Sequence, residues 1–264
     1  MRRFTYVALF LGIALVHGAE PVRTRIQVDK DAWGNASPAD IRAVCRSSSF
    51  EIEKHLGGLK LDPIVVRHSN EGPICLFRRG PEGERIILLD SKDTYWSQFG
   101  YQFAHEFCHH LCACRGGKNP NLWFEESLCE LASLFALRGM AETWKTQPPY
   151  SNWKGYAPNL AKYAQERIDK SALPEGMTLA AWFRQHEAEL RKNGTDREKN
   201  NVVARALLPL FEKNPAGWQA LATLNGGERD VAFRVHLKAW HDRAPKEQRP
   251  FIAELARAFE LKVD

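Results

Sequence analysis

The segment from His105 to His109 constrains this 264-residue chain more than any other, because it reads His-Glu-x-x-His. Residues four positions apart lie on one face of an α-helix, about one turn from each other. Two imidazoles at that spacing can reach a common point beside the helix. Glu106 is rotated by about 100° from His105, so its carboxylate lies beside that point. The pattern is typical of a helix that binds zinc through two histidines and uses the glutamate as a general base.

The surrounding sequence also favours a helix. An aliphatic run from Arg85 to Leu89 is typical of a buried strand. The residues from Ser91 to Asp93 then offer side chains that cap helices. Aromatic residues recur every four positions after this, as in a helix with one buried face. These aromatic residues are Tyr95, Phe99, Phe103 and Phe107. Gly116, Gly117 and Pro120 predict the end of the helix.

A catalytic zinc site usually has three protein ligands and an open position, so a third ligand is expected elsewhere. The stretch from Asn121 to about Leu137 predicts a second helix with Asn121 as its cap. Glu125, Glu126 and Glu130 lie in its first turns. Negative charge there also complements the helix dipole. Dipole complementation is therefore an alternative explanation for each of these glutamates.

The segment from Trp123 to Glu130 reads W-F-E-E-S-L-C-E. It resembles the W-x-x-E-G-x-A-E pattern of the gluzincin group of zinc metallopeptidases, within the peptidase MA-like superfamily. In these enzymes a second helix delivers a glutamate to zinc. Ser127 and Cys129 depart from the usual glycine and alanine, but both are small enough for close helix packing. The resemblance covers residues 84–137 and is specific for the metal site rather than for the substrate.

The resemblance implies that Glu126 is the third ligand and that Glu130 orients a ligating histidine. Glu125 is the rival ligand, but it points about 100° away from Glu126 on the helix. The resemblance also implies an α+β, zincin-like fold. Such a fold has a small N-terminal mixed sheet, a His-Glu-x-x-His helix, a glutamate helix and a mostly helical C-terminal part. One edge strand of the sheet is expected to form a wall of the substrate cleft.

The rest of the chain divides by its patterns into four parts. Residues 1–19 are expected to be a signal peptide, 20–143 the zincin-like α/β lobe with the metal site, 144–158 a loop and 159–264 a helical C-terminal lobe. Strands are predicted at 25–28, 63–67, 74–77 and 85–89. Helices are predicted at 37–56, 94–115, 122–137, 160–168, 179–191, 202–211 and 250–261.

The first residues predict export. A short basic stretch precedes an apolar run from Phe4 to Val16, and a small-residue cleavage site follows near Gly18 or Ala19. This pattern favours a periplasmic or secreted protein, with an uncleaved membrane anchor as the alternative. We expect no transmembrane segment after the signal, because no later apolar run approaches the required length.

Six cysteines follow the signal, and an even number in an exported chain suggests disulfides. The sequence leaves fifteen connectivities open. Cys45 and Cys75 are candidates for one bridge between a helix and a strand. A bridge from Cys108 or Cys112 to Cys129 would join the two metal-site helices. Cysteine ligation of zinc and free buried thiols are the alternatives. The six candidates are Cys45, Cys75, Cys108, Cys112, Cys114 and Cys129.

The loop at 144–158 is rich in proline and aromatic residues, and loops of that length are often functional. Tyr150 and Tyr156 are candidates to donate a hydrogen bond to the oxyanion of a tetrahedral intermediate. Aromatic packing is the alternative for both. His186, His236 and His241 are expected to be surface or packed residues rather than ligands.

These patterns predict an exported zinc-dependent metallopeptidase with one zinc ion per chain. Glu106 is the expected general base, and a zinc-activated water attacks the bond of a peptide or protein substrate. The net charge of +5 is mild and the basic residues are scattered, which excludes a nucleic-acid-binding role. A non-catalytic exported binding domain that contains zinc is the alternative function, and a structural protein without metal is a third. The oligomeric state is left open.

Overall fold

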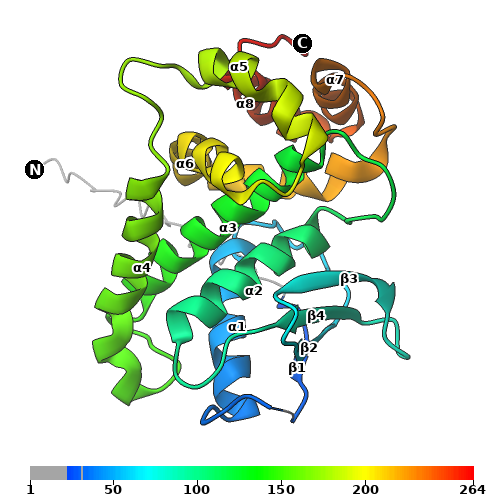
Figure 1. Ribbon diagram of the computed structural model, residues 1–264. Helices are drawn as coiled ribbons and strands as arrows, with labels where there is room; N and C mark the ends of the chain where they lie inside the picture. The colour runs from blue at the N-terminus through cyan, green and yellow to red at the C-terminus, as the bar shows by residue number, and fades with distance from the viewer. Residues whose placement is uncertain (1–22, 31) are drawn as a thin grey trace, which may run out of the picture.

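The computed structural model describes residues 23–30 and 32–264, so the expected signal peptide lies outside the described residues. The chain folds into an α+β structure with one four-stranded mixed sheet near its N-terminus (Figure 1). The strand order is β1-β2-β4-β3, and only the β3–β4 pair is antiparallel. The strands are β1 (Ile26–Val28), β2 (Ile64–His68), β3 (Ile74–Arg79) and β4 (Arg85–Leu89). The strand β3 is therefore an edge of the sheet.

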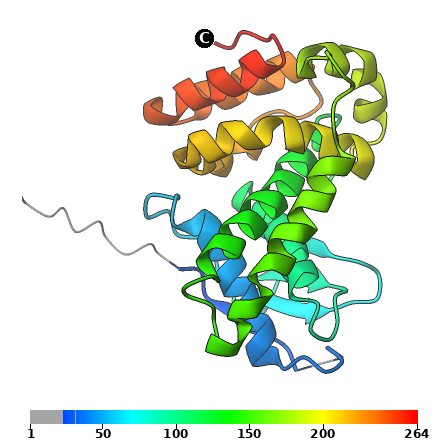
Figure 2. The same cartoon turned by 90° about the vertical axis from the view of Figure 1, so that its left-hand side faces the viewer.

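Helices make up most of the remaining structure. The helices that pack on the sheet are α1 (Pro38–Glu53) and α2 (Trp96–Leu111), and α3 (Leu122–Thr143) and α4 (Ala157–Lys170) lie farther from the strands (Figure 1). The C-terminal helices are α5 (Leu179–Lys192), α6 (Arg197–Lys213), α7 (Phe233–Arg243) and α8 (Arg249–Ala258). Three 3₁₀ segments connect them: η1 (Ser151–Tyr156), η2 (Pro215–Gly226) and η3 (Lys246–Gln248). Helices α5 to α8 gather at the end of the molecule opposite the sheet (Figures 1 and 2).

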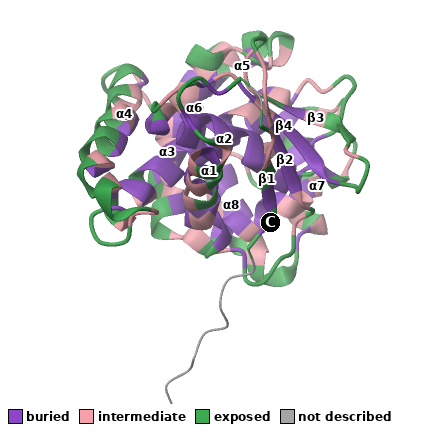
Figure 3. Ribbon diagram, turned by 90° about the horizontal axis from the view of Figure 1, so that it is seen from below, coloured by how far each residue is buried: buried purple, intermediate pink, exposed green. Residues whose placement is uncertain are grey.

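Helix α3 lies between the sheet-bearing part and the C-terminal helices and packs against both (Figure 1). Of its 22 residues, 15 are buried, so the rest of the fold encloses most of this helix. At its start, the Trp123 ring packs against Phe183, Phe233 and Phe259 of the C-terminal part. One hydrophobic core consequently runs from Ile26 to Val263. Figure 3 shows this buried interior, with the exposed face of α4 at its margin.

The sequence patterns locate the strands and α2 within four residues of their observed bounds, and α3 begins where predicted but continues six residues beyond Leu137. Tyr95 is an exception, since it precedes α2 and is 63% exposed rather than part of the buried aromatic face. The capping predictions also differ. Helix α2 begins at Trp96 without a side-chain cap, and the Asn121 amide contacts the Arg229 and Val231 carbonyls instead of capping α3. The expected loop at 144–158 contains η1 and the first residues of α4.

Candidate metal centre

Helix α2 fixes the positions of the two histidines of the His-Glu-x-x-His segment. Phe99, Phe103 and Phe107 are completely buried on one side of this helix and hold it against the protein core. His105 and His109 project from another side, with ring centroids 5.0 Å apart. The four-residue spacing thus places both imidazoles in one region beside α2, as the sequence predicts.

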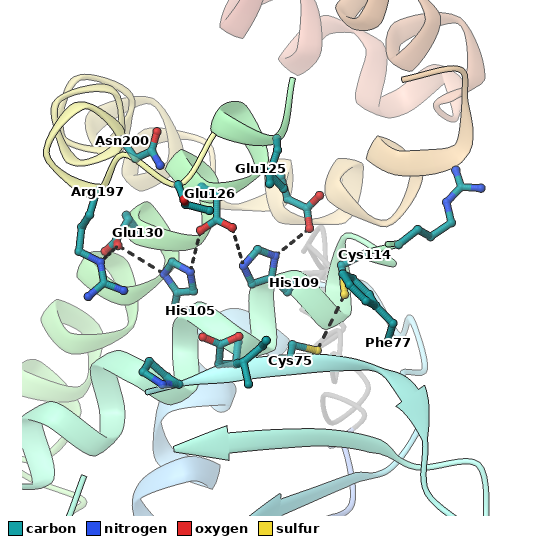
Figure 4. A pocket seen from close by; sticks show the side chains of 16 residues that line it. Cys75, Phe77, His105, His109, Cys114, Glu125, Glu126, Glu130, Arg197 and Asn200 are labelled. Atoms are coloured by element: carbon teal, nitrogen blue, oxygen red, sulfur yellow. Dashed lines mark hydrogen bonds and ion pairs between the residues drawn. The ribbon is translucent and has the colours of Figure 1, made fainter. Parts of the chain in front are cut away.

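Both imidazoles direct their Nε2 atoms at the same carboxylate on α3. His105 Nε2 lies 3.2 Å from Glu126 Oε2, and His109 Nε2 lies 3.5 Å from Glu126 Oε1. Figure 4 shows this carboxylate between the two rings. The packing of α2 on α3 therefore brings together the three side chains that the sequence proposes as ligands. Two neutral imidazoles and a carboxylate are a donor set that suits a catalytic zinc ion.

The opposite nitrogen of each ring faces a second carboxylate. His109 Nδ1 lies 2.7 Å from Glu125 Oε1, whose other oxygen accepts a hydrogen bond of 2.8 Å from Asn225 Nδ2. Glu125, the rival ligand in the sequence, thus lies on the far side of the ring from Glu126. Histidine ligands commonly donate their free N–H to such an oxygen, which fixes the tautomer and ring orientation. Asn225 comes from η2, 100 positions away, and no local pattern could have indicated it.

Glu130 takes the corresponding place beside His105. Its Oε1 lies 3.7 Å from His105 Nδ1 and 3.1 Å from Arg197 Nε of α6. The hydroxyl of Tyr101 also donates a hydrogen bond to the Glu130 carboxylate. Glu130 is 2% exposed, so these contacts compensate for the loss of water around its charge. The sequence indicated Glu130, whereas Tyr101 and Arg197 carried no recognisable signal.

The carboxylates control the protonation of the two rings. Burial by itself would lower the pKa of both imidazoles. Glu130 nevertheless raises the pKa of His105, and Glu125 raises that of His109 well above its ordinary value. Burial would raise the pKa of Glu126, but hydrogen bonds from the two imidazoles hold it far below its usual range. Ionised carboxylates around two imidazoles favour a bound cation, which replaces the ring protons.

Glu106 lies on α2 near His105 and His109. Its carboxylate is neither hydrogen-bonded nor ion-paired to either imidazole in the described structure, so we do not count it among the candidate metal ligands. It is 3% exposed and lines the same cavity as His105 and His109. Burial raises its pKa, although the nearby histidines oppose that shift. A carboxylate with a raised pKa at the edge of a cavity is suited to accept and return a proton.

Cys129 is an alternative to Glu126 as the third metal donor. Donor atoms of His105, His109 and Cys129 all lie within 4.8 Å of one another. Cys129 lies one turn beyond Glu126 on α3 and is completely buried. Burial raises the pKa of its thiol well above the ordinary value. Metals bind the thiolate, so ligation by Cys129 would require loss of its proton, whereas both imidazole Nε2 atoms already lie within 3.5 Å of the Glu126 carboxylate.

The donors open onto a cavity of about 290 Å³ between the sheet and the C-terminal helices. One wall is the edge strand β3, which contributes Ile74, Cys75 and Phe77. The opposite wall is the start of α6, which contributes Arg197 and Asn200 (Figure 4). The edge-strand wall thus lies where the sequence analysis expects one.

Tyr150 and Tyr156 do not line this cavity, which corrects the expectation that they could reach the reaction centre. Tyr150 is 40% exposed and its ring packs against Trp153 at 4.8 Å. Tyr156 packs against Trp144, and its hydroxyl accepts a hydrogen bond of 3.4 Å from the Ser97 backbone. Aromatic packing, the alternative explanation, accounts for both residues.

The six cysteines are buried free thiols. Cys75 Sγ lies 3.9 Å from Cys114 Sγ, and Cys108 Sγ lies 4.0 Å from Cys112 Sγ. The disulfides expected from the sequence remain predictions.

Comparison with models of protein families, with curated proteins and with solved structures finds no match to this chain. Among residues 23–30 and 32–264, none of the helices has both the length and the apolar character needed to cross a membrane. Any statement about function therefore depends on the donor set, the buried glutamate and the cavity.

Proposed function

We propose that this chain is an exported zinc-dependent metallopeptidase of the gluzincin type, with one zinc ion per chain. His105, His109 and Glu126 would hold the ion. The sheet, α2 and α3 would correspond to a zincin-like unit, and the proposed export rests on the N-terminal sequence. One observation carries the proposal: both Nε2 atoms converge on Glu126 while both Nδ1 atoms face other carboxylates. That arrangement turns both Nε2 atoms toward the third proposed ligand and away from the carboxylates that hold the rings.

When bound, zinc would supply a Lewis acid that polarises a peptide carbonyl and lowers the pKa of water toward about 7. Glu106 would accept a proton from the attacking water and deliver it to the nitrogen of the leaving amine. Its burial supports this role, because a raised pKa brings the carboxylate closer to the pH at which it must exchange a proton. Glu125 and Glu130 would keep each imidazole in the correct tautomer and orientation.

The edge strand β3 would hold the substrate. Its outer edge has no partner strand among the described residues, so its backbone can pair with an extended peptide. Ile74 and Phe77 are 47% and 59% exposed on this strand, beside the cavity. Exposed apolar side chains at such an edge can accommodate alternate side chains of a bound peptide. A peptide or protein substrate is consistent with these features.

Substituting Glu106 tests the proposed reaction. Glu106→Gln preserves the size of the side chain and removes the base, so zinc binding should persist while peptide hydrolysis falls by at least roughly 10²–10⁴-fold. The assay is cleavage of a peptide library by the wild type with and without a chelator, followed by kinetics on the best substrate. Equal cleavage by the wild type and Glu106→Gln would place the activity elsewhere. Zinc binding by both without any cleavage would favour the non-catalytic binding domain.

A further inference from the structure

Two cysteines from separate elements meet at the cavity wall. Cys75 lies on the edge strand β3, and Cys114 lies in the turn that follows α2. Their sulfur atoms are 3.9 Å apart although 39 positions separate them in the chain. Both side chains line the cavity that contains the candidate metal donors (Figure 4).

We propose that Cys75 and Cys114 form a disulfide that ties the β3 wall of the cavity to the end of the metal-binding helix. A disulfide requires a sulfur–sulfur distance of about 2.05 Å, so the two atoms need to approach by less than about 2 Å. Rotation of the two side chains accounts for a movement of that size. The proposal does not depend on the peptidase assignment.

The backbone around Cys114 is already held against β3. Ala113 has a φ of 52°, a left-handed conformation that is uncommon for residues other than glycine. This turn directs Cys114 back toward the sheet, and the Cys114 N–H donates to the His109 carbonyl at 3.0 Å. Gly116 lies against the Phe77 ring of β3, where an added Cβ would come within 3.1 Å of the ring.

A cation from the C-terminal part holds the same turn from its other side. The Arg229 guanidinium donates hydrogen bonds of 2.8 and 2.7 Å to the carbonyls of Arg115 and Gly116. The turn is thus fixed between Phe77 and Arg229. Little conformational entropy remains to be lost when the bond between Cys75 and Cys114 forms.

The other close pair of thiols serves as a contrast. The sulfur atoms of Cys108, on α2, and Cys112, directly after it, are 4.0 Å apart, and both residues are completely buried. Neither lines the cavity. Cys114 and Cys75 are 8% and 4% exposed, respectively, at the cavity wall. Thiol–disulfide exchange requires access to the attacking sulfur, which favours the Cys75–Cys114 pair.

Glutathione disulfide, or a protein disulfide of similar chemistry, is the oxidant. The Cys114 thiolate attacks one sulfur of the oxidant and forms a mixed disulfide, while one glutathione thiolate leaves. The Cys75 thiolate then attacks the Cys114 sulfur, forms the intramolecular bond and releases the second glutathione. The two protein thiols lose two protons and two electrons, and the two glutathione thiols that are formed take up these protons and electrons.

The test is disulfide mapping of the full folded chain in glutathione redox buffers. After oxidation, free thiols are alkylated and the denatured protein is cut with trypsin, which places Cys75 in the peptide 68–78. Cys108, Cys112 and Cys114 share the peptide 93–115, so a Cys108→Ala/Cys112→Ala variant is mapped in parallel. We expect the two peptides to be linked in both proteins. Cys114→Ser should abolish the link, and Cys45→Ser should leave it intact.

Thermal unfolding provides a second readout. Oxidation should raise the unfolding midpoint of the wild type by roughly 5–10 °C, because the bond closes a long loop of the unfolded chain. Cys75→Ser should show no such oxidant-dependent rise. Alkylation of both Cys75 and Cys114 in the oxidised wild type, or a bond from Cys108 or Cys112 in their place, would overturn the proposal. Zinc content measured in the same samples reports separately on the metal site.

Discussion

At the scale of single residues, the identity of the third metal donor is the central question. Glu126 and Cys129 lie one turn apart on α3, and both present a donor atom to the two histidines. The geometry favours Glu126, because both imidazole Nε2 atoms lie within 3.5 Å of its carboxylate, whereas the buried Cys129 thiol would have to lose its proton before it could bind a metal.

Glu126→Ala should therefore weaken zinc binding far more than Cys129→Ala. Loss of a supporting carboxylate costs roughly 10–100-fold in metal affinity, and loss of a ligand should exceed that range. Glu125→Ala is the matched control, because it removes the neighbouring carboxylate that faces His109 Nδ1. Competition with a chromogenic zinc chelator measures all three affinities. A larger loss for Cys129→Ala than for Glu126→Ala would assign the ligand to the thiol.

The sequence could indicate the candidate metal donors because their spacing is local. The four-residue interval of His105 and His109 requires only that α2 is helical, and the position of Glu126 follows from its resemblance to a known pattern. The position of Glu125 could not be predicted so directly. The rotation of about 100° per residue around α3 gives the direction of the Glu125 side chain. It does not reveal that the packing of α2 brings His109 Nδ1 next to the Glu125 carboxylate.

At the scale of elements, the buried aromatic side of α2 holds the histidines in place. Phe103 is completely buried in the core, whereas Tyr95, four residues before Phe99, is 63% exposed. A helical repeat of aromatic residues predicts a buried face but does not give the residue at which the helix begins. The four-residue repeat is a local property of the sequence, whereas the start of α2 depends on contacts with the rest of the fold.

Phe103→Ala should reduce the free energy of unfolding by about 3–5 kcal/mol, since it leaves a cavity beneath α2. Tyr95→Ala is the matched aromatic control and should change it by less than about 0.5 kcal/mol. Urea unfolding followed by circular dichroism measures both values. Equal losses for the two variants would contradict the assignment of the buried face of α2.

At the scale of the whole molecule, the C-terminal helices complete the site from a distance. Asn225 supports Glu125, and Arg197 supports Glu130, across sequence separations of 100 and 67 positions. Helix patterns indicate that a helical part follows the metal site, but not which of its side chains reaches back to it. Tyr150 and Tyr156 show the same limit of sequence-based prediction. Their position in a long loop did not reveal which way their side chains point.

His236 should make the stability of the whole molecule depend on pH. It is 4% exposed and faces the Phe124 ring, and burial lowers its pKa from 6.5 to about 4. The unfolded chain therefore binds a proton before the folded chain does as the pH falls. The associated stability is present above pH 6.5 and is lost between pH 6.5 and pH 4, by up to about 1.4 kcal/mol per pH unit.

Urea unfolding of the wild type and His236→Gln across this pH range measures the effect. A chelator is present throughout, so that metal release at acid pH does not contribute. The variant should lose less stability than the wild type as the pH falls from 6.5 to 4. Parallel losses in the two proteins would show that His236 is not held neutral by burial.

The zinc content of protein purified without added metal tests the central claim most directly. Elemental analysis should find about one zinc ion per wild-type chain, because three protein donors and one open position make a catalytic site. The His105→Ala/His109→Ala double variant, with its folding checked by circular dichroism, should contain essentially none. Stoichiometric zinc in the folded double variant, or a wild type that retains no zinc even after incubation with the metal, would contradict the account.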